Sequence, residues 1–275
     1  MSQAPFVRGD ADLFQPTEYA RSGWSDNMIN GPALVGLAAQ TLEDEFGADG
    51  FLPARLTADL FRPAHRVPTA VRTRLVRDGH RLRASDCEIL QDDVIVARAT
   101  MIQYRTSSAP PGQEWISTGP GFAVPPVSEG AAYCVGSDAE GWSSSAGMGE
   151  GIEIHQNASR KRVYHRVPEV VGGRPASPFV RAVVAAEATS LVTNMGTLGI
   201  GYINGDLTVV LSRLPVGDYV GVQADSHWCA EGISVGAATL SDDLGPFGIG
   251  MVTALANPAA QIDFAGRKAG PTLEV

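Results

Sequence analysis

The stretch Leu-Thr-Ala-Asp-Leu-Phe-Arg-Pro at residues 56–63 returns 151 residues later as Leu-Thr-Val-Val-Leu-Ser-Arg-Leu-Pro at residues 207–215. The surroundings of the two copies are also alike. An apolar stretch with helical spacing precedes each copy, and three strand-like segments follow it, with a Gln-Asp-Asp turn at residues 91–93 and a Ser-Asp-Asp turn at residues 241–243. An internal repeat of this kind indicates a tandem duplication of one structural unit.

Length and composition are those of an ordinary globular protein with room for two cores. The chain has 275 residues, of which 44% are hydrophobic and 19% are charged, so neither disorder nor low complexity is indicated. Two units of roughly 130 residues each fit this length. The formal net charge of −9 repels phosphate backbones and anionic membrane surfaces. This balance argues against nucleic acid as a partner.

Cysteine usage and hydropathy predict the compartment. Cys87, Cys134 and Cys229 are odd in number and have neither disulfide nor zinc spacing, which favours a reducing environment. The sequence has no run of about 18 apolar residues, and residues 1–12 lack the basic-then-apolar order of a signal peptide. We therefore expect a cytoplasmic protein with no membrane insertion.

The first half is predicted to form a helix followed by an antiparallel meander. Apolar residues recur at helical spacing in residues 32–46, with Pro32 suited to the first turn and Gly47 just past the end. The dipeptide Asp78-Gly79 signals a hairpin. Strand patterns cover residues 55–61, 70–77, 82–90 and 94–104. Residues 1–106 are therefore expected to form one unit.

The second half is predicted to repeat this plan after a linker. Residues 107–150 are rich in Pro, Gly and Ser, which is typical of a linker or an inserted excursion. Ser177 and Pro178 suit the cap and the first position of a helix that should run to about residue 194. Residues 151–275 should therefore form the second unit. Strands are expected in it at residues 152–156, 162–166, 202–212, 219–227, 232–240 and 247–255.

Glu187 is the most unusual residue of the second predicted helix. The only charged side chains within residues 178–195 are Arg181 and Glu187, and the helical neighbours of Glu187 are mostly apolar. Burial of a carboxyl group raises its pKa toward the range of a general base that works near neutral pH. Glu187 is thus a candidate catalytic residue. The alternative is that it emerges at the edge of the helix or pairs with an arginine.

Four short motifs accompany the predicted helices and strands: Gly-Pro-Ala-Leu-Val-Gly (31–36), Leu-Phe-Arg-Pro (60–63), Arg-Asp-Gly (77–79) and Ile-Asn-Gly-Asp-Leu-Thr (203–208). Together with the paired helix and sheet units, their order and spacing resemble the acyl-CoA thioesterase II family over most of the chain except the linker. The resemblance implies an α+β double hotdog fold, in which two tandem units each wrap an antiparallel sheet around a long central helix. It also implies an acyl-CoA substrate, with coenzyme A as part of that substrate and no separate cofactor.

The resemblance assigns roles to residues of the second half. Glu187 stands where the family carries an aspartate that helps to activate water, and Asn204 stands where it carries a hydroxyl or an amide. The family's third residue is a glutamine on the last strand, and here Val252 or Thr253 takes its place, of which only Thr253 is polar. We therefore predict Glu187, Asn204 and Thr253 as catalytic residues. Asn204 beside Gly205 would also suit a plain turn or bulge.

The start of the first helix is the predicted site for the thioester oxygen. Free N–H groups at a helix N-terminus, reinforced by the helix dipole, stabilise an oxyanion. By resemblance, Asn30 and Gly31 occupy the place of the family's glycine pair, whereas Pro32 has no N–H to donate. Trp24, just upstream, is predicted to line the acyl or pantetheine channel. The alternatives are an ordinary helix entry and a core tryptophan.

A basic cluster is confined to two predicted strands joined by the Asp-Gly turn. These arginines could meet the phosphates of coenzyme A, although a solvated sheet face is the stronger interpretation. They are Arg72, Arg74, Arg77, Arg81 and Arg83. The five histidines lack metal-ligand spacing, and the sequence contains no Gly-x-Ser-x-Gly elbow. We therefore expect neither a metal site nor a serine hydrolase.

The sequence leaves the function open between two main hypotheses. The first is an acyl-CoA thioesterase. The second is a protein of the same fold that binds acyl-CoA or another hydrophobic ligand without cleaving it, because the family's glutamine is missing. A scaffold with a vestigial site is a third, weaker hypothesis. Since exposed sheet edges are commonly protected by pairing, the two halves should pair within the chain, and further association into a homo-oligomer is expected.

Overall fold

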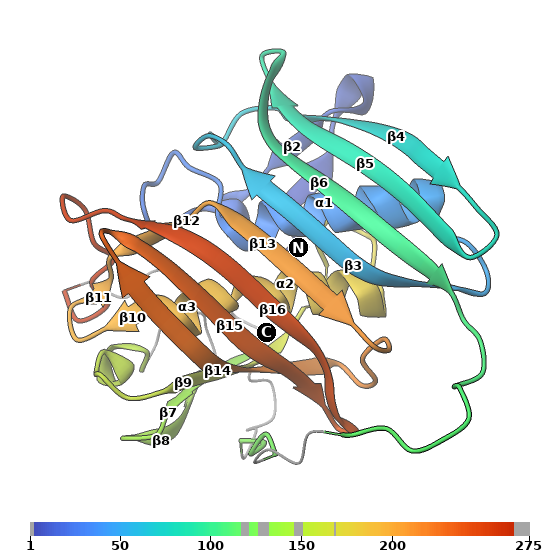
Figure 1. Ribbon diagram of the computed structural model, residues 1–275. Helices are drawn as coiled ribbons and strands as arrows, with labels where there is room; N and C mark the ends of the chain where they lie inside the picture. The colour runs from blue at the N-terminus through green and yellow to red at the C-terminus, as the bar shows by residue number, and fades with distance from the viewer. Residues whose placement is uncertain (1–2, 117–120, 126–131, 146–150, 168, 267–275) are drawn as a thin grey trace.

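The computed structural model describes residues 3–116, 121–125, 132–145, 151–167 and 169–266. It is an α+β double hotdog, in which one curved antiparallel sheet wraps around central helices (Figure 1). The helices are α1 (Gly31–Phe46), α2 (Pro178–Glu187) and α3 (Thr189–Asn194). The strands are β1 (Phe6–Arg8), β2 (Phe14–Pro16), β3 (Phe51–Leu60), β4 (Ala70–Asp78), β5 (Leu82–Gln91), β6 (Val94–Arg105), β7 (Tyr133–Ser137), β8 (Gly141–Ser145), β9 (Lys161–Arg166), β10 (Met195–Gly196), β11 (Gly199–Ile200), β12 (Tyr202–Asn204), β13 (Asp206–Leu211), β14 (Tyr219–Ala230), β15 (Ile233–Asp242) and β16 (Gly245–Ala256).

The repeated strand pairs with its own copy at the centre of the sheet. Strands β3 and β13 run antiparallel, and Thr57 is the Cα partner of Thr208, its counterpart 151 residues later. The two hydroxyl oxygens are 3.3 Å apart. An internal twofold axis therefore passes between these threonines, and it joins the two halves into one sheet of order β4-β5-β6-β3-β13-β16-β15-β14-β9-β7-β8, with β12 beside β16.

Both long helices begin where the sequence predicts. The Asn30 side chain caps α1 by accepting from the N–H of Ala33 at 2.8 Å, and the Ser177 hydroxyl caps α2 by accepting from Val180 at 3.1 Å. The predicted helix of residues 178–194 is not continuous, however. At Ala188 the backbone N–H bonds to the carbonyl of Ala185, three residues back, at 3.0 Å. This tighter turn separates α2 from α3.

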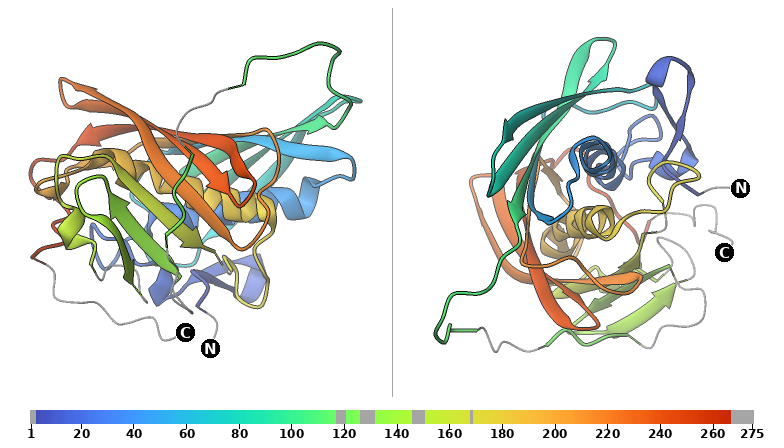
Figure 2. Two further views of the ribbon diagram at one scale, coloured as in Figure 1. Left: turned by 90° about the horizontal axis from the view of Figure 1, so that it is seen from below. Right: turned by 90° about the vertical axis from the view of Figure 1, so that its right-hand side faces the viewer.

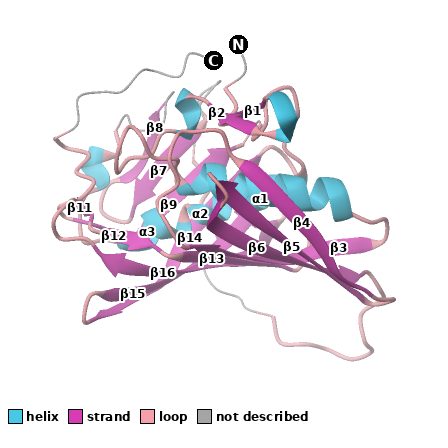
Figure 3. Ribbon diagram, turned by 90° about the horizontal axis from the view of Figure 1, so that it is seen from above, coloured by secondary structure: helices cyan, strands magenta, loops and turns pink. Residues whose placement is uncertain are grey.

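Helices α1 and α2 lie side by side inside the curve of the sheet (Figure 2, right). Their close approach depends on a small residue in α1, because a Cβ on Gly36 would be 2.8 Å from a methyl group of Val184. On the sheet, Leu56 of β3 and Leu207 of β13 point inward and are fully buried. The short strands β1 and β2 cover the helices on the side away from the sheet (Figure 3). No helix in the described ranges is long and apolar enough to cross a membrane.

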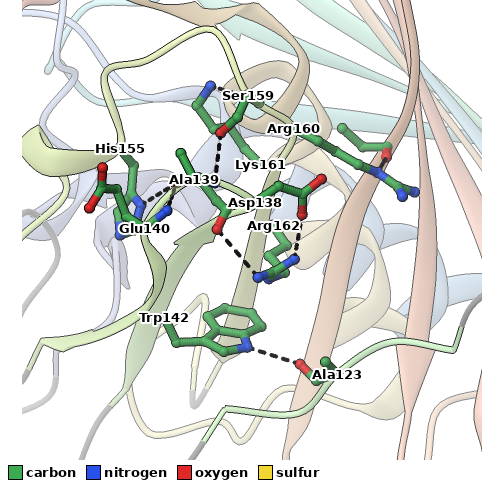
Figure 4. Close-up of polar contacts among 12 residues, drawn as sticks. Ala123, Asp138, Ala139, Glu140, Trp142, His155, Ser159, Arg160, Lys161 and Arg162 are labelled. Atoms are coloured by element: carbon green, nitrogen blue, oxygen red, sulfur yellow. Dashed lines mark hydrogen bonds and ion pairs between the residues drawn. The ribbon is translucent and has the colours of Figure 1, made fainter.

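Part of the segment predicted as a linker is built into the sheet. Strands β7 and β8, within residues 107–150, pair with each other and extend the sheet beyond β9. The Trp142 indole N–H donates to the Ala123 carbonyl at 3.1 Å (Figure 4), and the Phe122 ring packs on Trp142 and Tyr164. The strand predicted at residues 152–156 is instead a 3₁₀ turn, Glu153–His155.

Candidate active site

Glu187 lies where the two halves meet. It is the last residue of α2, and its carboxyl group rests against the first turn of α1. A Cβ on Gly31 would be only 2.0 Å from Glu187 Oε1. The carboxyl group therefore occupies the space that the side chain of any other amino acid at position 31 would need. The Glu187 side chain is buried, with 9% of the residue's surface exposed. A carboxyl group from one repeat therefore faces the helix start of the other.

Asn204 holds the carboxyl group from the sheet side. Its Nδ2 donates a hydrogen bond to Glu187 Oε1 at 3.1 Å. Strand β12 positions this amide, because Asn204 is paired with Ala254 of β16 in the register of the sheet. Asn204 is thus a partner of Glu187 and not only a turn residue beside Gly205.

The environment of Glu187 favours a base that titrates near neutral pH. Burial raises the pKa of this carboxyl group to about 8, and the hydrogen bond from Asn204 partly opposes that rise. The N-terminal end of α1 carries a partial positive charge, which also favours the ionised carboxylate. The alternative that Glu187 pairs with an arginine does not fit, since its hydrogen-bond partner is an amide.

The first turn of α1 retains one N–H group for a ligand. The N–H of Ala33 is used by the Asn30 cap, Leu34 bonds to the Asn30 carbonyl, and Pro32 has no N–H. Among the described residues none accepts a hydrogen bond from the amide of Gly31. Gly31 is therefore the donor that the first turn offers beside Glu187.

Asn30 and Trp24 have structural contacts that limit their predicted roles. Both polar atoms of the Asn30 side chain already form hydrogen bonds. Its Oδ1 caps α1, and its Nδ2 donates to the carbonyls of Tyr19 and Arg21, both at 3.2 Å. Trp24 is half-buried and packs on the main core. Asn30 thus shapes the helix start, and the position of Trp24 fits the core alternative.

Thr253 lies away from Glu187 and Asn204, on the other face of the sheet. Its predicted place in the site is therefore wrong. Its side chain points to the outer face of β16, where the hydroxyl donates to the carboxylate of Asp206. The inward residues at this point of the strand are Val252 and Ala254, both buried. Because side chains alternate along a strand, the inner face of β16 is apolar at this point.

Tyr133 is a buried residue that the sequence did not indicate as part of the site, and the charge of Glu187 acts on its phenol. Burial raises the pKa of the Tyr133 phenol, and the charge of Glu187 raises it further. The Tyr133 ring meets His165 edge to face at 4.9 Å. Burial lowers the pKa of His165 to about 4, so this imidazole is neutral at physiological pH. Tyr133 falls in the range predicted as a linker, and no pattern there indicated an inward-facing strand.

The first half carries an amide where the second carries Glu187. Counted from the helix caps, Gln40 in α1 corresponds to Glu187 in α2. Gln40 is buried, and its Nε2 donates to Asp44 at 2.9 Å. The two repeats therefore differ at this helix position, which holds a carboxyl group in the second half and an amide in the first.

The basic cluster on β4 and β5 is mostly paired on the sheet surface. Arg72 lies 3.2 Å from Glu88, and Arg74 lies 2.9 Å from Asp86. Arg83 lies 2.8 Å from Asp78 across the hairpin. This arrangement fits the interpretation of a solvated sheet face, because each of these three arginines already has a carboxylate partner.

A second polar cluster surrounds His155 and has a structural role. Its Nδ1 and Nε2 lie 2.9 Å from the hydroxyl oxygens of Ser137 and Ser143 respectively. Close by, Asp138 and Arg162 form an ion pair at 2.8 Å (Figure 4). His155 is fully buried, so these contacts satisfy a core histidine. Within the ranges that the structure describes, no group of three His, Cys, Asp or Glu side chains could hold a metal ion.

The fold and this site define a double hotdog protein whose helix start in one half faces a buried carboxyl group from the other. The chain belongs to the acyl-CoA thioesterase family. Residues 20–104 match the N-terminal domain of acyl-CoA thioesterase, and residues 104–251 match the C-terminal domain. No curated protein matches the sequence.

Solved structures show the same fold at low sequence identity. The TesB protein of Mycobacterium avium subspecies paratuberculosis is 16% identical, with a TM-score of 0.60 over 90% of this chain and 93% of that one. The acyl-CoA thioesterase II TesB2 of Mycobacterium marinum is 14% identical, with a TM-score of 0.57 over 92% and 96%. A hot dog protein of unknown function from Alicyclobacillus acidocaldarius is 13% identical, with a TM-score of 0.63 over 94% and 98%.

Proposed function

We propose that this protein hydrolyses fatty acyl-CoA thioesters, with Glu187 as the general base. The observation that carries the proposal is the contact between the buried carboxyl group of Glu187 and Gly31 in the first turn of α1. General base and oxyanion donor are the two groups that attack of water on a thioester requires. The family membership supports acyl-CoA as the substrate class.

The proposed reaction follows from these positions. Ionised Glu187, held by Asn204, takes a proton from water, and the hydroxide forms a bond to the thioester carbonyl carbon. The negative charge that develops on the carbonyl oxygen is stabilised by the Gly31 N–H and the positive end of α1. The carbon–sulfur bond then breaks, and the thiolate of coenzyme A takes the proton back from Glu187. The products are a fatty acid and free coenzyme A, and no cofactor takes part.

The proposal also includes the cellular compartment in which the enzyme works. Cys87, Cys134 and Cys229 are all free thiols, of which Cys229 is exposed. An unpaired thiol on the surface suits a reducing compartment, and we infer that the enzyme works in the cytoplasm. We also propose that the chain self-associates.

Release of free thiol from a panel of acyl-CoA substrates tests the hydrolysis. We expect turnover by the wild type and a loss of about 10²- to 10⁴-fold in Glu187→Gln, which is the usual contribution of a general base. Glu114→Gln is the matched control, because Glu114 is exposed and lies outside the helices and strands. Equal rates in Glu187→Gln and the wild type, or no release from any chain length, would refute the proposal.

A second candidate function is binding of acyl-CoA without hydrolysis. The observation that favours it is the apolar inner face of β16, where Val252 and Ala254 are buried while Thr253 points outward to Asp206. Calorimetric binding of acyl-CoA with no product after long incubation would establish this function instead. Binding together with thiol release that depends on Glu187 would exclude it.

A further inference from the structure

A hollow of about 580 Å³ lies beside the loop that follows β3, and we call it the Arg62 hollow. Residues 62–67 form one wall, and the turn between β5 and β6 forms another. This volume falls in the range of small-molecule sites. Its ionisable lining residues are Arg62, His65 and Asp92, and its apolar ones include Val67, Val94 and Val96.

The equivalent positions of the second half fill this space with their own side chains. The Val96 carbonyl accepts from the N–H of Phe61 at 3.0 Å. The Phe247 carbonyl, 151 residues later, accepts from the N–H of Ser212 at 2.9 Å, so the two halves have the same register here. Phe247 is fully buried, and the Arg213 guanidinium lies over its ring at 5.4 Å. Valine in place of this phenyl ring leaves room on the first half.

Arg62 is the counterpart of Arg213, and its guanidinium is free to bind a ligand. Arg213 donates to the buried carboxylate of Asp242 at 2.7 Å, whereas the first half has Gln91 at that position. Arg62 is exposed and forms no ion pair among the described residues, not even with Asp92 of the same hollow. A guanidinium in such a place suits phosphate oxygens, which it binds in a bidentate geometry.

The wall that carries Arg62 is fixed in place by hydrogen bonds. Gln91 accepts from the His65 N–H at 2.9 Å through Oε1 and donates to the His65 carbonyl at 2.7 Å through Nε2. On the side of α1, the N–H of Ile29 donates to the Ala64 carbonyl at 2.8 Å. The hollow is therefore preformed, which lowers the entropic cost of binding a ligand.

We propose that the Arg62 hollow binds a phosphorylated nucleoside, with the Arg62 guanidinium on the phosphate. The apolar walls suit the face of a base. The Asp92 carboxylate accepts hydrogen bonds, as carboxylates do from ribose hydroxyls in dinucleotide sites. Asp92 would repel a bare phosphate ion, so the mixed lining favours a nucleotide over inorganic phosphate.

Two sources supply this chemistry, namely the coenzyme A part of an acyl-CoA and a free nucleotide. Asn27 lines the hollow and precedes Gly31 by four residues, so their Cα atoms are at most about 14 Å apart. The extended pantetheine arm of coenzyme A bridges such a distance. The first source rests on the proposed function, and the second is independent of it.

Calorimetric titration with adenosine 3′,5′-bisphosphate tests the site without any reaction. Arg62→Ala should weaken binding by about 10- to 100-fold, which is the usual contribution of hydrogen bonds to a charged group. Arg55→Ala is the matched control and should bind like the wild type, because Arg55 is exposed on β3, roughly 20 Å from Arg62. A wild type that binds the bisphosphate no better than adenosine, or equal affinity in Arg62→Ala, would overturn the proposal.

Val94→Glu blocks the same hollow from its other wall. Val94 is 45% exposed, so the fold should survive, while the added carboxylate repels the phosphate and takes the space of the base. Binding of the bisphosphate should fall at least as far as in Arg62→Ala. Val76→Glu is the control with wild-type affinity, since Val76 is 51% exposed on β4, outside the hollow. Unchanged affinity in Val94→Glu would place the nucleotide elsewhere and overturn the proposal.

Kinetics with an acyl-CoA and with the matching S-acyl-N-acetylcysteamine, which has no nucleotide, identify the source. If the hollow holds the nucleotide of coenzyme A, the ratio of the two kcat/KM values should fall about 10- to 100-fold in Arg62→Ala. If it holds a free nucleotide, this ratio should equal that of the wild type although Arg62→Ala has lost bisphosphate binding. A wild type without hydrolysis would refute the proposed function alone, because the calorimetric result does not depend on turnover.

Discussion

The carboxyl group of Glu187 fills the space beside the Cα of Gly31, with Oε1 2.0 Å and Cδ 2.8 Å from where a Cβ would be. The two residues belong to different repeats and are 156 positions apart in the sequence. Glycine is therefore needed at position 31 for a steric reason, and not because the backbone requires its conformational freedom. The contact also fixes the distance between the proposed base and the proposed oxyanion donor.

Gly31→Ala is expected to displace the Glu187 carboxyl group and to lower kcat/KM by about 100-fold, because a shift near 1 Å at a reacting group has an effect of that order. Glu187 is at the end of α2, so its flexible side chain should move while the fold survives. Acyl-CoA hydrolysis and thermal unfolding measure the two effects separately.

Gly196→Ala is the control for this substitution. A Cβ on Gly196 would be 4.0 Å from its nearest neighbour, the Gly199 carbonyl oxygen, so the methyl group fits. Its activity should equal that of the wild type. Full activity in Gly31→Ala would show that the position of Glu187 is unimportant for the reaction.

The pH dependence of hydrolysis should report the ionisation of Glu187. A general base is active when deprotonated, so kcat/KM should rise with pH and level off above a pKa of about 8. Asn204→Ala removes the hydrogen bond that opposes the effect of burial, so the rising limb should move to higher pH and the rate at pH 7 should fall. A profile that is flat from about pH 6 to 9 in the wild type would assign the base to another group.

The fold could be predicted from the sequence because its signals are local and occur twice. Strand alternation, the Asp78-Gly79 hairpin and the two helix caps each depend on neighbouring residues, and the family model and the solved structures confirm the double hotdog. The pairing of Thr57 with Thr208 follows from the duplication, since a twofold axis brings equivalent residues together.

The site could be predicted only in part, because it depends on contacts between distant residues. A single carboxylate among apolar helical neighbours indicated Glu187, but nothing local indicated that the phenol of Tyr133, within a Pro- and Gly-rich stretch, is buried and experiences the charge of Glu187. The prediction of Thr253 as a site residue depends only on its polar side chain. Alternation along β16 turns its side chain to the outer face, and the direction of that alternation could not be known before the register was seen.

Glu187→Gln is expected to stabilise the protein at high pH. Burial raises the pKa of Glu187 from 4.5 to about 8, so the folded state binds a proton that the unfolded state releases above pH 4.5. The contribution of Glu187 to stability is therefore complete below pH 4.5 and is lost as the pH rises to about 8. At about 1.4 kcal/mol per pKa unit, the loss has an upper value of about 5 kcal/mol.

Urea unfolding of Glu187→Gln and the wild type at about pH 5 and pH 9 measures this effect. The gain in the free energy of unfolding should be larger at the higher pH, since glutamine stays neutral and keeps an oxygen for the Asn204 amide. Glu114→Gln should show no such difference, because Glu114 is exposed. An equal gain at both pH values would mean that Glu187 is not desolvated.

Arg213 and Arg62 are repeat equivalents with different environments, and their alanine variants should differ in stability. Arg213 donates from Nη2 to Asp242 at 2.7 Å, and the Asp242 side chain is fully buried. Burial by itself raises the pKa of Asp242, but the Arg213 guanidinium and the N–H groups of Val216 and Leu244 hold it below its usual range.

Arg213→Ala leaves the buried Asp242 carboxylate without its cation, so it should lower the free energy of unfolding by about 3 kcal/mol at pH 7. The difference from the wild type should shrink as the pH falls below about 4, because a lowered pKa contributes stability only above the unfolded value.

In the first half the residue equivalent to Asp242 is Gln91, which bonds the backbone of His65 and needs no counter-ion. Arg62 is exposed, so Arg62→Ala should change stability by less than about 0.5 kcal/mol. Equal losses in the two variants would show that the pairing with Asp242 does not explain the difference between the repeats.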